Sequence, residues 1–115
     1  MKGCFPMANS KALALLGFAA KAGRLSYGMD AALKALKSGK ARLVTAACDV
    51  SQKSRKEAAF FANKGSVEFL TLEGLDIKTL SDAVGRRCGI LTINDSGFAD
   101  AFVKAYTRGG NANDE

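Results

Sequence analysis

Residues 28–37, GMDAALKALK, carry the residue types that could hold a phosphate group. A short extended stretch precedes Gly28, and a helical pattern follows it. The first backbone amides of a helix, here those of Met29, Asp30 and Ala31, have no partner within the helix and lie at the positive end of its dipole. Because Gly28 has no Cβ, another backbone can approach it closely. We therefore expect this turn to offer unpaired N–H groups to an anion.

Two lysines follow on the same expected helix. Ala31, Lys34 and Lys37 recur at a spacing of three residues, which places them along one edge, away from the side of Leu33 and Leu36. An RNA backbone laid across the turn would meet the amides first and these ammonium groups next. The alternative is that the acidic residue simply favours the first helical turn and the lysines form a solvated face.

A second basic feature is the sequence VGRRCGI, which places Arg86 and Arg87 in a loop before the last expected strand. In sheets of this kind, such loops can reach the same edge as the turn at Gly28. We expect the two basic features to lie together. The alternative is an ordinary polar loop.

Catalytic chemistry has little support in this sequence. The chain contains no histidine, so the commonest general base is missing. Asp49 follows an expected strand, where a phospho-acceptor could lie, but a helix N-cap is also needed there and no carboxylate cluster that could hold Mg²⁺ is evident. The stretch SGKA lacks the upstream glycine and the Ser/Thr of a P-loop. We expect a protein that is not an enzyme and has no cofactor.

Metal binding and membrane insertion are also not expected. Cys4, Cys48 and Cys88 form no Cys-x-x-Cys pair, and no histidine could complete a zinc tetrahedron. Residues 1–8 lack a long apolar core, and the longest apolar run, residues 12–20, is about half the length of a membrane-spanning helix. We therefore predict a cytoplasmic protein with reduced thiols.

The charge balance favours a polyanionic partner. Lys and Arg number 17 against 11 Asp and Glu, which gives a formal charge of +6 and a pI near 9.4. A basic protein gains affinity for nucleic acid through the release of counterions. Many basic proteins merely have solvated basic faces, so composition alone leaves the partner open.

Helical and extended patterns alternate along the chain. The expected helices begin at N-cap candidates: Asn9 or Ser10, Asp49 or Ser51, and Asp95 or Ser96. Glycines at positions 23, 39, 65 and 85 follow helical patterns and are expected to end them. The expected strands span residues 24–27, 41–48, 67–72 and 89–94.

This order of elements predicts an α/β fold. Five helices alternating with four short strands imply a small four-stranded sheet with helices on both faces. With 115 residues, the chain is long enough to bury a core as one domain. We predict a single domain over residues 9–107, with loose tails at 1–8 and 108–115.

Three segments together resemble a known family. LLGFAAKAGRLSYGMDAALKALKSGKARLVTAACDVS, LSDAVGRR and ILTINDSGFADAF occur in the order and spacing of the kink-turn RNA-binding ribosomal protein family, which includes the large-subunit proteins seven-Ae and thirty-e. Within it, the chain looks closest to the bacterial YlxQ-type members. The similarity covers residues 13–106. It implies a three-layer α/β/α sandwich with a mixed sheet, and RNA binding without catalysis.

The resemblance also implies a set of RNA contacts. In the family, a Gly-x-Asn-Glu-x-x-Lys segment reads sheared G·A pairs at a kink-turn, and the loop before the last strand contacts an extruded nucleotide. Gly28 and Lys34 match that segment, whereas Asp30 replaces the asparagine and Ala31 the glutamate. Combined with the turn and the basic loop, the predicted RNA-contact residues are Gly28, Met29, Asp30, Ala31, Lys34, Lys37, Arg86, Arg87 and Cys88.

The two replacements bear on specificity. An ionised Asp30 can only accept hydrogen bonds, so it faces the guanine O6 and N7 acceptors badly while suiting an N1–H or amino donor. Ala31 removes a further acceptor. We expect a non-enzymatic protein that binds structured RNA, kink-turn-like or ribosomal, in the ribosome or another ribonucleoprotein, with a relaxed kink-turn code. The alternative is a protein-interaction adaptor of the same fold that has lost specific RNA recognition.

Overall fold

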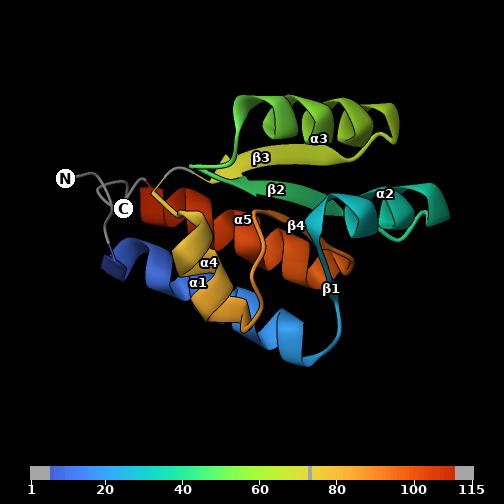
Figure 1. Ribbon diagram of the computed structural model, residues 1–115. Helices are drawn as coiled ribbons and strands as arrows, with labels where there is room; N and C mark the ends of the chain where they lie inside the picture. The colour runs from blue at the N-terminus through green and yellow to red at the C-terminus, as the bar shows by residue number, and fades with distance from the viewer. Residues whose placement is uncertain (1–5, 73, 111–115) are drawn as a thin grey trace.

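The computed structural model describes residues 6–72 and 74–110 of the chain, and the side chains of residues 11–72 and 74–106. Figure 1 shows the arrangement of its helices and strands. In chain order, the elements are α1 (Pro6–Lys21), β1 (Leu25–Tyr27), α2 (Gly28–Ser38), β2 (Leu43–Ala47), α3 (Gln52–Lys64), β3 (Glu68–Leu72), α4 (Ile77–Val84), β4 (Ile90–Ile93) and α5 (Ser96–Gly110).

The strands form one mixed sheet in the order β1-β4-β2-β3. β2 and β3 are parallel, whereas β4 runs antiparallel to both β1 and β2. β1 and β3 are therefore the edge strands. The first strand of the chain is joined to the last one, and this brings the turn after Tyr27 close to the segment that leads into Ile90.

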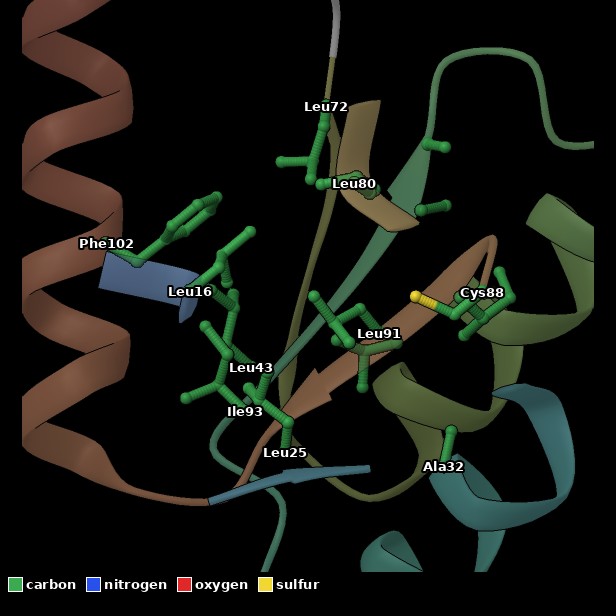
Figure 2. Close-up of a cluster of buried hydrophobic side chains, with 14 of the residues drawn as sticks. Leu16, Leu25, Ala32, Leu43, Leu72, Leu80, Cys88, Leu91, Ile93 and Phe102 are labelled. Carbon is green, nitrogen blue, oxygen red and sulfur yellow. The ribbon is translucent and has the colours of Figure 1, made fainter. Parts of the chain in front are cut away.

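Helices cover both faces of the sheet. α1, α4 and α5 lie on one face, and α2 and α3 lie on the other (Figure 1). Figure 2 shows Phe102 of α5 and Leu16 of α1 beside Leu43 and Ile93 of the sheet, with Ala32 of α2 on the opposite side. The three-layer α/β/α sandwich with a four-stranded mixed sheet is thus confirmed.

The two faces of the sheet are packed by side chains of different size. Phe102 and Leu16 are almost fully buried on the α1/α5 face. On the other face, α2 buries Ala32 and Ala35, and α3 buries Ala58 and Ala62. Alanine has a short side chain, so it permits close approach of a helix backbone to the strands.

Helix α2 packs on the sheet through its alanines rather than its leucines. The helical pattern predicts that Ala32, Leu33 and Leu36 face inward. Ala32 is buried as predicted, but the second buried residue is Ala35, and both leucines are only partly buried. The short alanine side chains therefore lie over the sheet, and Leu36 packs against the edge of the core. Gly39 ends the helix with φ +78°, in the left-handed conformation expected for it.

The terminal helices extend beyond the predicted boundaries. α1 begins at Pro6 rather than after Asn9 or Ser10, because proline needs no hydrogen-bond acceptor in the first helical turn. α5 continues to Gly110. The rest of the predicted tails, residues 1–5 and 111–115, lies outside the described residues.

Asp49 is a capping residue for a helix that is distant in the sequence. Its Oδ1 accepts a hydrogen bond from the N–H of Ile77, the first residue of α4, at 2.8 Å. α3 is capped by Ser51 instead, whose Oγ accepts from the N–H of Ser54 at 3.2 Å. The Asp49 carboxylate therefore has a structural role as a cap of α4. α5 has Asp95 as its cap, with the N–H of Phe98 at 3.1 Å.

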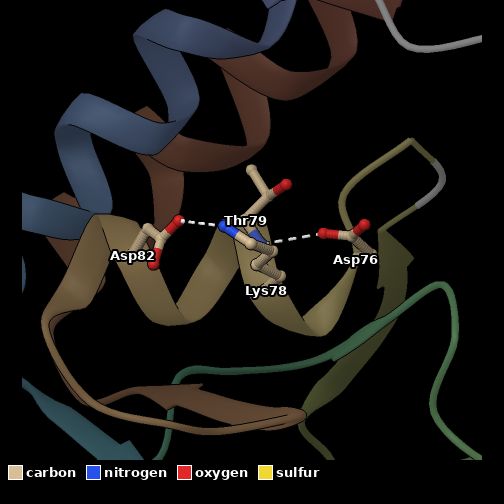
Figure 3. A network of polar contacts seen from close by, with 4 residues as sticks. All are labelled: Asp76, Lys78, Thr79 and Asp82. Atoms are coloured by element: carbon tan, nitrogen blue, oxygen red, sulfur yellow. Dashed lines mark hydrogen bonds and ion pairs between the residues drawn. The ribbon is translucent and has the colours of Figure 1, made fainter.

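Asp76 caps α4 together with Asp49. Its Oδ1 accepts from the N–H of Thr79 at 2.8 Å, as Figure 3 shows. Hydrogen bonding from the side chain and then the backbone of Thr79 lowers the pKa of Asp76. Further along the same helix, Lys78 and Asp82 form an exposed ion pair at 3.3 Å.

Replacing Asp76, the N-cap residue of α4, should destabilise the protein in a pH-dependent manner. We expect Asp76→Ala to lower the free energy of unfolding by about 1 kcal/mol at pH 7, because the N–H of Thr79 loses its acceptor. The folded-state pKa of Asp76 is depressed, so its contribution is present above the unfolded pKa near 3.8 and is lost as the pH falls through the folded value. Urea midpoints at pH 7, 5 and 3 measure this.

The matched control is Asp82→Ala, which removes a carboxylate from the same helix but only an exposed ion pair. We expect it to change the stability by less than about 0.5 kcal/mol at pH 7. The capping role would be contradicted if the two substitutions lowered the free energy of unfolding equally. It would also be contradicted if the loss of stability in Asp76→Ala were as large at pH 3 as at pH 7.

Candidate functional site

The turn between β1 and α2 has an open surface. Gly28 adopts φ +90°, and a Cβ placed there would meet no atom within 4 Å. Any other residue would be strained in this conformation. Tyr27, at the N-cap of α2, makes no side-chain capping hydrogen bond. The first amides of α2 thus have no side-chain cap from Tyr27, at a point that another molecule can approach.

The predicted contact residues of α2 divide into two groups. Asp30, Lys34 and Lys37 are exposed. Met29 and Ala31 are partly buried, and the side chain of Met29 packs against the hydrophobic core. Met29 could therefore take part in binding mainly through its backbone, whereas both lysines can reach a ligand with their charges.

The basic loop lies against the turn, as expected from the sequence. The guanidinium carbon of Arg86 is 4.7 Å from the centroid of the Tyr27 ring, in a cation–π contact. This contact places a positive charge next to the residue that precedes Gly28. Arg87 is also exposed in this loop.

Tyr27 is a candidate site residue that sequence reasoning missed. It is half-buried, and it pairs with Leu91 across the β1–β4 ladder. The available signal was an aromatic residue in the N-cap position, where Ser, Thr, Asp or Asn is usual. Burial raises the pKa of the Tyr27 hydroxyl above its usual value of 10.0, and the charge of Arg86 partly offsets that effect. The phenol is therefore neutral near pH 7 and can donate a hydrogen bond.

A groove of about 670 Å³ runs beside Tyr27 on the α1/α4 side of β1. Its floor is made of small and apolar residues, among them Gly17, Ala20 and Leu25. Charged side chains lie at its rim, and these are Lys21, Asp82 and Arg86. An apolar floor with a partly basic rim suits a flat ring that carries an anionic group.

Cys88 does not present its side chain to this surface. It is only 5% exposed, and burial raises the pKa of its thiol. Its backbone N–H donates to the Oγ of Ser81 at 3.1 Å. The side chain of Cys88 belongs to the buried core cluster, as Figure 2 shows, because Cys88 forms the first buried position ahead of β4.

Neither a candidate metal centre nor a membrane-spanning helix occurs among the described residues. Within residues 6–72 and 74–110, no group of three His, Cys, Asp or Glu side chains could hold a metal ion. In the same part of the chain, none of the helices combines the length and apolarity that crossing a bilayer requires.

Comparison with known proteins gives one family and a common fold. The model of the family described as "Ribosomal protein L7Ae/L30e/S12e/Gadd45 family" matches residues 10–103. No curated protein matches the chain significantly.

Two solved structures illustrate the similarity of fold. A protein of unknown function from Bacillus halodurans has a TM-score of 0.78 at 23% identity, with 84% of this chain and 97% of that chain covered. The Giardia lamblia 15.5kD RNA binding protein has a TM-score of 0.71 at 16% identity, with 94% of this chain and 92% of that chain covered. At these identities, the similarity establishes the fold.

The contact between Arg86 and Tyr27 can be measured by titration. Arg86→Gln should raise the pKa of Tyr27 further, because the positive charge that favours the phenolate is lost. Ring resonances in NMR spectra separate Tyr27 from Tyr106. Arg87→Gln, which removes a neighbouring exposed charge, should leave the pKa of Tyr27 closer to that of the unmodified protein. An unchanged Tyr27 titration in Arg86→Gln would show that the contact is not formed in solution.

Proposed function

Since this chain belongs to the ribosomal protein L7Ae/L30e/S12e/Gadd45 family, we propose that it is a non-enzymatic protein that binds structured RNA at the β1–α2 turn. The RNA is kink-turn-like or ribosomal, and the protein acts in the cytoplasm as part of the ribosome or another ribonucleoprotein. The RNA-binding domain of this proposal spans residues 9–107, and we propose that it is of the bacterial YlxQ type.

The observation that carries the proposal is the position of Arg86 over Tyr27, directly beside the open turn at Gly28. A basic residue from a distant part of the chain is thereby brought next to the turn. Lys34 and Lys37 are exposed on α2, the helix that begins at this turn, and in this proposal they belong to the same RNA-binding surface. Membership of this family, and the similarity in fold to the Giardia lamblia 15.5kD RNA binding protein, also favour RNA as the ligand.

Each part of this surface has a role in the proposal. The amides after Gly28 and the ammonium groups of Lys34 and Lys37 bind phosphates, which fixes the position of the RNA. Arg86 and Arg87 contact a flanking strand or an extruded base, and the Tyr27 ring supplies a stacking surface next to them. No step requires a nucleophile or a general base.

Specificity for the standard kink-turn is reduced in this proposal. Asp30 is exposed on the outer side of α2, where it can act only as an acceptor. The neighbouring Ala31 cannot form a hydrogen bond with its side chain. We propose that the protein retains affinity through phosphate contacts while its discrimination between G·A-containing and ordinary helices is weaker.

The first test compares a kink-turn RNA with a plain duplex at two salt concentrations. We expect binding of RNA at low salt, and we expect Lys34→Ala to weaken it by about 1 kcal/mol and to reduce the salt slope by about one unit. Lys104→Ala removes an exposed lysine from α5, on the other side of the sheet, and should change neither value. Failure to bind both RNAs at low salt would reject the proposal and favour the adaptor alternative.

The second test restores the asparagine and glutamate of the family segment. The double variant Asp30→Asn, Ala31→Glu should increase the preference for the kink-turn over the duplex by about 1–3 kcal/mol, because base-edge donors and acceptors are regained. Single variants show which position carries the gain. Thermal unfolding by circular dichroism verifies that the fold is unchanged. A preference equal to that of the unmodified protein would mean that this turn does not read bases.

A further inference from the structure

The edge strand β1 sends neighbouring side chains to opposite faces of the sheet. Tyr27 faces the groove beside Arg86, whereas Ser26 faces the side covered by α2. On that second side lies a separate hollow of about 360 Å³. Its polar lining consists of Ser26, Lys34, Ser38, Lys40 and Asn94.

The hydroxyl groups in this hollow retain hydrogen-bonding capacity. The Nδ2 of Asn94 donates to the Oγ of Ser26 at 2.8 Å, so the hydroxyl hydrogen of Ser26 remains available for donation. The Oγ of Ser38 donates to the carbonyl of Ala35 at 3.2 Å, so its lone pairs remain available for acceptance. The Oδ1 of Asn94 is buried and has no hydrogen-bond partner among the described residues.

The hollow is electrostatically suited to an anion. Lys34 and Lys40 are its charged residues, and no carboxylate lines it. Two acidic residues adjoin lining residues in the sequence: Asp95, which forms an ion pair with Arg24 at 3.8 Å, and Asp30, which is exposed one helical turn before Lys34. Within the lining, a ligand with negative charge would thus meet two cations and no carboxylate.

The end of α2 could oppose anion binding, because a helix C-terminus carries partial negative charge. Here the carbonyl groups of Ala35 and Leu36 accept hydrogen bonds from the backbone N–H groups of Gly39, Lys40 and Ala41. These bonds occupy part of the carbonyl groups that the end of α2 leaves without partners in the helix. The charge of Lys40 lies at the same end and offsets the dipole further.

The hollow is continuous with the proposed RNA surface. Lys34 and Ala31 belong both to the edge of α2 that begins at Gly28 and to the lining of the hollow. A chain that crosses the turn from the Tyr27 groove would reach Lys34 and then Lys40. Its path would go over the edge of the sheet, from one face to the other.

We propose that this hollow is a second RNA subsite, which binds the ribose–phosphate backbone of the strand that leaves the Gly28 turn. This inference rests on the proposed function and extends it. Lys34 and Lys40 bind phosphate oxygens. The hydroxyl groups of Ser26 and Ser38 exchange hydrogen bonds with a ribose 2′-hydroxyl, which acts as both donor and acceptor. A free phosphate could use only the donors.

The test uses a kink-turn hairpin made entirely of RNA and a chimera whose internal loop is RNA and whose arms are DNA. The unmodified protein should bind the chimera more weakly, since the 2′-hydroxyls outside the loop are lost. Lys40→Ala should weaken binding of the all-RNA hairpin by about three- to tenfold, with a smaller salt slope. Lys104→Ala serves as the control for loss of one exposed lysine.

A serine variant tests the contact with the ribose. Ser38→Ala should weaken binding of the all-RNA hairpin and leave binding of the chimera unchanged. Ser38 is exposed, so this substitution preserves the core. If Ser38→Ala weakens binding of both probes equally, or of neither, the assignment of the hollow to ribose is wrong.

The outcomes separate this inference from the proposed function. Absence of binding by the unmodified protein overturns both. Binding that Lys34→Ala weakens but Lys40→Ala leaves unchanged overturns the second subsite alone. Polyglutamate is a further probe. If Lys40→Ala weakens its binding as strongly as that of RNA, the hollow is a general polyanion site and the inference is wrong.

Discussion

β1 is held to the sheet by antiparallel pairing with β4, in a register that sets Leu25 opposite Ile93 and Tyr27 opposite Leu91. A shift of one residue would exchange the faces of Ser26 and Tyr27 and would remove both from their hollows. The same register fixes the point at which the chain turns into α2, because Gly28 follows directly with its positive φ. The geometry of the candidate site therefore depends on three residues of strand.

The contact between Arg86 and Tyr27 connects this strand to the α4–β4 loop. Its energy is modest, about 0.5–1 kcal/mol for a partly exposed pair, so it contributes more to position than to stability. It holds a guanidinium group next to the residue that precedes Gly28, and among the described residues Arg86 forms no ion pair with a carboxylate. The positive charge thus remains available to a polyanion.

Much of the fold was predictable because its signals are local. Gly23, Gly39 and Gly85 adopt positive φ at helix ends, as the sequence suggested. Long-range capping was not predictable. Asp49 accepts from Ile77, which is 28 residues away, and only the parallel pairing of β2 and β3 brings the two segments together. Sequence periodicity likewise did not distinguish which residues of α2, alanines or leucines, lie over the sheet.

The sequence by itself determined the order of elements, the basic charge and the glycine-initiated turn, since these depend on residue type and near neighbours. Only the tertiary structure decided that Tyr27 underlies Arg86, that the side chain of Cys88 is buried, and that Ser26, Lys40 and Asn94 line one hollow. These facts follow from strand register and from helix packing on the sheet. Both are set by contacts between residues distant in the chain, which a pattern of neighbours does not encode.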